Sequence, residues 1–148
     1  MPTYTVHTAN LSLSPEQKGR LAEAITAAHN RHTGAPGYLA QVLVIELARA
    51  SHFIGGKPNT AAHVYVHGLI RAGRTRAAKQ ALIEDILARA KESCGVGTED
   101  VWVYLQEIAA EQMAEFGRLL PQPGAEGQWR QGFTPEKIAA FIRAGVTL

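Results

Sequence analysis

Two stretches of the chain show the same succession of strand-like and helix-like patterns. In the first stretch, residues 3–8 are rich in Thr, Tyr and Val, a composition typical of a β-strand. Apolar side chains then recur at intervals of three and four between Leu21 and Ala28, which predicts a helix with one buried face. A continuous apolar run at 42–45, within residues 41–47, predicts a second strand of the kind that is covered on both faces.

The second stretch repeats this order later in the chain. Histidine and tyrosine alternate with valine within residues 62–70, which predicts a strand with two different faces. An apolar stripe within residues 82–90 predicts a helix, and residues 101–105 predict a fourth strand. Between the two stretches lies a loop with Gly, Pro and Asn at 55–59, and residues 53–54 are predicted to form a short strand before its turn.

Capping residues mark the beginning of both helices. Ser14 is predicted to cap the first helix, with Pro15 at the first helical position and Gln17 completing a capping box. Thr75 is predicted to cap the second helix. Glycine follows each periodic segment, and glycine is the residue that most often ends a helix.

The order of elements predicts two consecutive β-α-β units, residues 2–48 and 62–106, in a single domain of residues 1–148. Strands joined through a helix are parallel and need a right-handed crossover. The predicted fold class is therefore α+β or α/β, with a four-stranded mixed sheet and two helices on one of its faces. The other face would expose apolar strands to water, so we expect an oligomer.

Residues 107–148 form a C-terminal extension without the pattern of a second domain. A short helical stretch is predicted at 111–116, followed by a segment with several Pro and Gly residues. Thr134 and Pro135 are predicted to begin a final helix. We expect this extension to wrap across the core or a neighbouring subunit.

The composition is that of a globular chain with little net charge. The sequence has 148 residues, 46% of them hydrophobic, and a formal net charge of +2. So small a basic excess argues against nucleic-acid binding, which needs a concentrated basic surface. A single cysteine, Cys94, excludes an internal disulfide. The apolar runs are too short to span a membrane and the first residues do not resemble a signal peptide, so we expect a cytoplasmic protein.

Pro2 and a pair of arginines are the first candidates for chemistry. Removal of the initial methionine would free the secondary amine of Pro2, and α-amino groups have an ordinary pKa of roughly 7.7–8.0. Many chains begin with Met-Pro for no catalytic reason, so the sequence leaves open whether Pro2 is catalytic. Arg71 and Arg74 flank Gly73 between a predicted strand and a predicted helix, where two guanidinium groups can converge on one carboxylate. A solvated basic turn is the alternative.

Tyr104 and Glu115 form a further candidate pair. Tyr104 is predicted near the end of the fourth strand, and a phenol with a carboxylate can bind or polarise a water molecule. The spacing alone favours an ordinary role for both, at the core edge and on a solvated face. Several histidines, among them His29 and His63, invite a metal site. No carboxylate or cysteine accompanies them at metal-site spacing, so no metal site is predicted.

Short motifs along most of the chain match a known pattern, which begins with the proline directly after Met1 and the double β-α-β plan. The matching stretches are residues 22–29, 33–34, 39–42, 53–56, 66–69, 71–74, 101–104, 115–118 and 120–124. On these residues the chain resembles the tautomerase superfamily and, more closely, the cis-3-chloroacrylic acid dehalogenase family. The similarity extends from Pro2 to Trp129, while residues 30–32, 35–38 and 57–61 differ.

The resemblance implies a catalytic site of six residues: Pro2, His29, Arg71, Arg74, Tyr104 and Glu115. The three basic side chains would bind a substrate carboxylate, with the histidine in a supporting role. The phenol and the carboxylate would position or activate water, and the proline would deliver or remove a proton at carbon. The resemblance also implies a homotrimer, and neither a metal nor an organic cofactor.

Two reactions on small carboxylic acids suit these residues. In hydrolytic dehalogenation or hydration, activated water adds to a 3-haloacrylate and cationic Pro2 protonates the neighbouring carbon. In the alternative, keto–enol tautomerisation, neutral Pro2 moves a proton on a 2-keto acid such as phenylpyruvate. Positive charge on Arg71 and Arg74 lowers the pKa of Pro2 and negative charge on Glu115 raises it, and the sequence does not decide which prevails. A trimeric binding or signalling module without catalysis is the second alternative.

Overall fold

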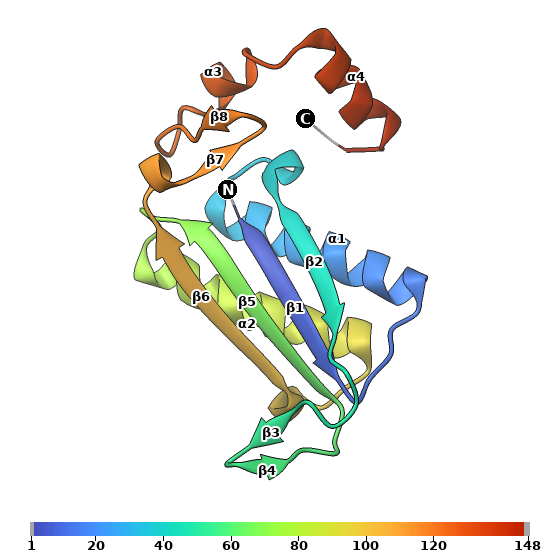
Figure 1. Cartoon of the computed structure of the whole chain (residues 1–148). Helices are drawn as coiled ribbons and strands as arrows, with labels where there is room; N and C mark the ends of the chain where they lie inside the picture. The colour runs from blue at the N-terminus through green and yellow to red at the C-terminus, as the bar shows by residue number, and fades with distance from the viewer. Residues whose placement is uncertain (1, 147–148) are drawn as a thin grey trace.

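A four-stranded mixed sheet forms the centre of the molecule, in the order β2-β1-β5-β6 (Figure 1). The computed structural model describes residues 2–146. The strands are β1 (Thr3–Ala9), β2 (Gln41–Glu46), β5 (His63–Arg71) and β6 (Val101–Ile108). β1 is parallel to β2 and β5 is parallel to β6, whereas β1 and β5 are antiparallel. The predicted mixed sheet of two β-α-β units is confirmed.

Both long helices lie on the same face of this sheet, as predicted (Figure 1). They are α1 (Pro15–Thr33) and α2 (Arg76–Cys94). Ser14 and Gln17 form the predicted capping box at the start of α1, and the Thr75 side chain accepts a hydrogen bond from the Ala78 N–H at the start of α2. A glycine in the left-handed conformation ends each helix. The capping residues and glycines recognised in the sequence therefore determine where both helices begin and end.

The buried faces of the strands and helices meet in an aliphatic core. Its wholly buried members include Val6, Leu21, Ile25, Val64, Val66, Ile70, Leu82 and Ile86. Complete burial of such a side chain contributes roughly 1.5–3 kcal/mol, so these residues supply much of the driving force for folding. In both helices, the apolar positions predicted to be buried are the positions that face this core.

The opposite face of the sheet is open to solvent in the single chain. Leu43 and Ile45 of β2 are 42% and 43% exposed, and Trp102 and Tyr104 of β6 are 42% and 55% exposed. The prediction that the run at 42–45 is covered on both faces is wrong for one chain. Alternate residues of β2 pack toward the helices, and the chain provides no second layer for the others.

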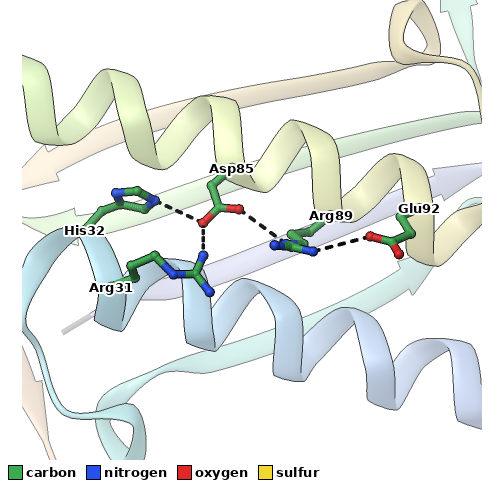
Figure 2. A network of polar contacts seen from close by, with 5 residues as sticks. All are labelled: Arg31, His32, Asp85, Arg89 and Glu92. Atoms are coloured by element: carbon green, nitrogen blue, oxygen red, sulfur yellow. Dashed lines mark hydrogen bonds and ion pairs between the residues drawn. The ribbon is translucent and has the colours of Figure 1, made fainter.

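A polar network joins the two helices on the side away from the sheet (Figure 2). Asp85 of α2 is paired with Arg31 and lies 3.0 Å from the His32 Nε2 of α1. Arg89 Nε also donates to Asp85, at 3.3 Å. His32 therefore has a structural partner in this network. No helix among residues 2–146 has the length and apolar character needed to cross a bilayer.

The connections at the two ends of the sheet differ in size (Figure 1). At one end, β3 (Phe53–Ile54) and β4 (Lys57–Pro58) form a small hairpin, which confirms the short strand predicted at 53–54. At the other end lies the C-terminal extension. Its elements are β7 (Ala114–Glu115), β8 (Arg118–Leu119), α3 (Glu126–Arg130) and α4 (Pro135–Arg143).

The helical stretch predicted at 111–116 is wrong. Only a 3-10 turn, η3 (Ala110–Gln112), precedes the hairpin of β7 and β8. Phe116 and Gly117 both have positive φ, 53° and 76°, and this two-residue turn reverses the chain. The final helix is confirmed as α4, where the Thr134 side chain accepts a hydrogen bond from the Lys137 N–H.

The extension packs around an aromatic cluster of its own. Tyr38, Trp129 and Phe133 are buried there, with Phe116 and Phe141 in ring contact. Tyr38 lies in a 3-10 turn between α1 and β2, so the cluster attaches the extension to the first β-α-β unit. The extension lies over the end of the sheet at which β1 begins (Figure 1). Five of the six candidate residues lie toward that end, and Tyr104 does not.

Candidate active site

Arg71 is the last residue of β5 and is buried beneath the extension, at 3% exposure. Its Nη1 donates a hydrogen bond to the Pro121 carbonyl at 2.5 Å, and its Nη2 forms an ion pair with the Glu126 carboxylate. Its Nε is buried and has no hydrogen-bond partner in the part of the chain that the structure describes. A buried donor without a partner costs free energy, which a bound acceptor would recover.

Arg74 provides a second donor of the same kind. It follows the turn at Gly73 and is half-buried, and its buried Nε has no hydrogen-bond partner among the described residues. Burial and the positive charge of Arg71 lower the pKa of Arg74. The two guanidinium groups are close enough for the charge of one to affect the pKa of the other. That both converge on one carboxylate stays a prediction.

His29 is buried in α1 and hydrogen-bonded to Tyr4. The Tyr4 Oη lies 2.8 Å from the His29 Nδ1, with the two rings edge to face. Burial and the positive charges of Arg74, the amino terminus and Arg71 lower the pKa of His29 to about 3. His29 is therefore neutral at physiological pH, and its Nδ1 is already engaged.

Gly68 explains how Tyr4 reaches His29. A Cβ at Gly68 would lie 2.5 Å from the Tyr4 ring and 2.7 Å from Leu105. A larger residue at position 68 of β5 would therefore displace the Tyr4 ring from its place beside His29. The glycine between His67 and Leu69 is a packing requirement of the site.

Pro2 and Glu115 border the same region. Pro2 is buried, and its carbonyl accepts a hydrogen bond from the Gln41 N–H at 3.0 Å. The next residue, Thr3, lines a cavity of about 470 Å³ together with Glu115. Burial raises the pKa of Glu115, against the opposing effect of the positive charges of the amino terminus and Arg71. Glu115 is thus a half-buried carboxylate in a positively charged setting.

The walls of this cavity are mostly apolar. They include Leu39, Leu69, Ile108, Met113 and Phe116. Tyr38 also lines the cavity, and its buried hydroxyl has no hydrogen-bond partner within residues 2–146. The cavity therefore combines apolar walls with the Glu115 carboxylate, whose pKa the positive charge of Arg71 influences.

Tyr104 is the candidate that the single chain leaves apart from the other five. The prediction that it lies near a strand end is wrong, because β6 continues to Ile108 and Tyr104 is in its middle. It lies on the open face of the sheet, in ring contact with Tyr65 and in a different cavity, lined also by His63 and Trp102. The sequence predicts a shorter strand because the continuous apolar run ends at Leu105 and Gln106 and Glu107 follow.

The comparisons with known proteins identify the family and the fold. A family model described as "Putative oxalocrotonate tautomerase enzyme" matches residues 1–132. The chain belongs to this tautomerase family. Among solved structures it is similar to N1, a member of the cis-3-chloroacrylic acid dehalogenase family, with 34% identity, a TM-score of 0.84, and 92% of this chain and 94% of that chain covered. The resemblance noted from the sequence is confirmed.

Two further solved structures extend the comparison. Ps01740 shares 34% identity at a TM-score of 0.71, with 76% of this chain and 99% of that chain covered. Q0 fused 4-OT, described as a symmetric trimer, shares 28% identity at a TM-score of 0.74, with 82% and 97% covered. No curated protein matched this sequence. The chain is thus a tautomerase-type protein whose fold and family are established.

The candidate site of this tautomerase-family protein also includes three residues that the sequence analysis did not identify, namely Tyr4, Glu126 and Tyr38. Tyr4 lies on the face of β1 that is buried, and its ring packs against Gly68 of the neighbouring strand. A glycine within a strand was the available sign that a large side chain packs there. Glu126 lies in the extension, far from Arg71 in sequence, and no local pattern connects them. Tyr38 lies in one of the short stretches that depart from the family pattern. Among the described residues, no group of His, Cys, Asp and Glu is arranged to hold a metal ion.

Proposed function

We propose that this tautomerase-family protein is a cofactor-independent enzyme that adds water to small unsaturated carboxylic acids, with 3-haloacrylates as the substrate class. One observation supports this most: Arg71 and Arg74 each have a buried Nε that finds no partner among residues 2–146, and Glu115 is half-buried within the electrostatic influence of Arg71. Water addition to an unsaturated acid requires cationic groups that bind the substrate carboxylate and, beside them, a protein carboxylate that positions the water. The similarity to N1 of the cis-3-chloroacrylic acid dehalogenase family supports the same substrate class.

The substrate carboxylate binds to the two unpaired Nε donors. Each charge-assisted hydrogen bond contributes roughly 1.5–3 kcal/mol, so the pair is sufficient to orient a small acid. If Tyr4 donates its proton to the His29 Nδ1, the His29 Nε2 carries the ring proton and adds a neutral donor. Binding of the carboxylate by positive charge also draws electron density from the double bond and prepares its far carbon for attack by water.

Glu115 positions the attacking water and accepts its proton. Its raised pKa makes it a stronger base than an exposed glutamate, which suits this role near neutral pH. Pro2, once the initial methionine is removed, protonates the neighbouring carbon as a cation. With a 3-haloacrylate, the product of water addition carries halide and hydroxyl on the same carbon, and loss of the halide and of the hydroxyl proton leaves an aldehyde acid.

Tyr104 joins this chemistry through assembly. We propose a homotrimer, as the similar fused 4-OT is described to be, in which a second copy covers the open sheet face. Thr3, Gln41 and Leu69 lie at one end of that face and also line the Glu115 cavity. A copy packed on the face would therefore reach the cavity. The exposed Tyr104 of one copy then becomes available to the site of another.

Tautomerisation of 2-keto acids is the second candidate. It needs a carboxylate site and Pro2 as a base, and does not need Tyr104. The apolar cavity of about 470 Å³ also accommodates a larger side chain, such as that of phenylpyruvate. The positive charges of Arg71 and Arg74 favour neutral Pro2, the form that this reaction uses.

The test uses purified protein with a defined amino terminus. Protein that begins at Pro2, verified by intact mass, is assayed with 3-chloroacrylate isomers and with phenylpyruvate, beside protein that retains one residue before Pro2. We expect turnover only from the protein with the free proline. Equal activity in both preparations would exclude Pro2 chemistry, because an acylated nitrogen does not titrate near neutrality. Turnover of neither substrate would favour the binding-module alternative.

A further inference from the structure

The C-terminal extension contacts the proposed carboxylate site through one side chain. Both hydrogen-bond acceptors of Arg71 come from this segment: the Pro121 carbonyl receives Nη1, and the Glu126 carboxylate pairs with Nη2. The ion pair is buried, with side-chain exposures of 3% for Arg71 and 15% for Glu126. Each terminal nitrogen thus makes one of these contacts, whereas Nε has no hydrogen-bond partner among residues 2–146.

We propose that Glu126 is a positioning residue that holds the Arg71 guanidinium in the orientation that binds the substrate carboxylate. The proposal rests on the proposed function, in which the Arg71 Nε binds that carboxylate. It assigns to segment 121–126 a part in substrate binding, although the segment supplies no group that touches the substrate.

Glu126 is itself held in place. Its Oε2 accepts a hydrogen bond from the Gly124 N–H at 2.9 Å, so the two carboxylate oxygens have separate partners. Trp129, one turn further along α3, donates from Nε1 to the Leu119 carbonyl at 2.8 Å, and Arg118 donates to the Trp129 carbonyl at 2.7 Å. These bonds attach α3 to β8. The carboxylate therefore meets Arg71 from a fixed support.

The chemistry of arginine explains why such a residue is needed. Its long side chain loses considerable conformational freedom when it is fixed, and a partner that fixes it in advance removes that cost from substrate binding. A negative charge beside Arg71 also reduces its repulsion of Arg74, so both guanidinium groups can face one anion. A carboxylate that instead competed with the substrate for Arg71 would have the opposite effect on binding.

The experiment compares Glu126→Ala, Glu126→Gln and Glu126→Asp in mature full-length protein, with whichever of the two substrates the wild type turns over. Loss of preorganised binding raises KM and leaves kcat nearly unchanged, so we expect KM to increase by at least about tenfold and kcat to change by less than about threefold. Asp should restore part of the loss, and Gln, which keeps an oxygen acceptor without the charge, should lie between. Glu46→Gln, which removes a surface carboxylate paired with Lys18 at the opposite end of the sheet, is the matched control and should leave both constants unchanged.

A double-mutant cycle decides whether Glu126 acts through Arg71. In an Arg71→Ala background, we expect Glu126→Ala to cause no further loss of kcat/KM. An equal loss in both backgrounds, an unchanged KM in the single variants, or a decreased KM would each overturn the proposal. If Glu126→Ala does not fold, the Gln and Asp variants provide the same comparison. An Arg71→Ala enzyme with wild-type KM would overturn the proposed function together with this inference, whereas a large Arg71 effect without a Glu126 effect overturns the inference alone.

Discussion

The two hydrophobic clusters of this protein are built from different side chains and different local structure. The core between sheet and helices is aliphatic and consists of residues on long, capped elements. The cluster in the extension is aromatic and is held by short elements, of which the longest is the nine-residue α4. The first cluster defines the fold. The second cluster closes one end of the sheet and brings Glu115 and Glu126 to Arg71.

The difference shows that the site depends on both regions for separate contributions. The β-α-β units supply the positive charges and the buried His29. The extension supplies the carboxylates, one beside the cavity and one paired with Arg71. A variant of the core should therefore change the stability of the whole chain, and a variant of the extension should change the site with less effect on the sheet.

Arg71→Ala should have the largest effect, because Arg71 belongs to both regions. We expect kcat/KM to decrease by about a hundredfold or more, from loss of charge-assisted hydrogen bonds to the substrate. Removal of one member of a buried pair also leaves Glu126 uncompensated, at a cost of about 3–5 kcal/mol in unfolding free energy. Arg74→Ala should lose activity with a smaller loss of stability, since Arg74 is half-buried. Kinetics and urea denaturation measure both effects, and equal stability losses would contradict the distinction.

Ile86→Ala and Phe133→Ala compare the two clusters directly. Ile86 is wholly buried in the aliphatic core, so its truncation should lower the unfolding free energy of the whole domain by about 2–5 kcal/mol. Phe133→Ala should instead increase amide hydrogen exchange within residues 107–146 and leave exchange in β1 and β5 nearly unchanged. Exchange mass spectrometry of both variants provides the measurement. Uniform loss of protection in Phe133→Ala would show that the clusters unfold as one unit.

His29 should make stability depend on pH. Its pKa is lowered from 6.5 to about 3 by burial and neighbouring positive charges, so the unfolded chain binds a proton that the folded chain refuses. Stability should therefore decrease as pH falls from about 6.5 toward 3, with a contribution of up to roughly 1.4 kcal/mol per pH unit. Urea denaturation of wild type and His29→Gln between pH 7 and pH 5 tests this, and parallel pH dependences would refute it.

Tyr38→Phe should produce the smallest change, with a sign that is unusual for a buried position. The Tyr38 hydroxyl is buried and has no hydrogen-bond partner among residues 2–146, so its removal deletes an unsatisfied polar group and breaks no hydrogen bond to those residues. We expect the unfolding free energy to rise by about 1 kcal/mol. Tyr4→Phe, which removes a hydroxyl bonded to His29, is the matched comparison and should be destabilising. A destabilised Tyr38→Phe would show that this hydroxyl has a partner in solution.

The sequence predicted most of the fold because the relevant signals are local. Ser14, Gln17 and Thr75 mark helix starts, and the period of apolar residues identifies the covered face of each element. The hairpin at Phe116 and Gly117 was missed because its turn depends on positive φ values, which the sequence of an aromatic residue before glycine only weakly indicates. The pairing of Arg71 with Glu126 was missed because it joins residues far apart in sequence through a region without regular periodicity. Tyr104 is separated from the other candidates because its position in β6 places it on the open face of the sheet. A sequence pattern does not indicate which residues of another subunit would lie beside it.

The central claim is that Glu115 activates water in a site that the extension completes, and Glu115→Gln tests it most directly. The variant keeps the size of the side chain and removes its ability to accept a proton. We predict that kcat/KM for a 3-haloacrylate falls by about a hundredfold or more, while tautomerisation of a 2-keto acid changes by less than about threefold. A loss by the same factor with both substrates would mean that Glu115 serves a step common to both reactions. No loss with either substrate would contradict the claim that Glu115 takes part in the chemistry.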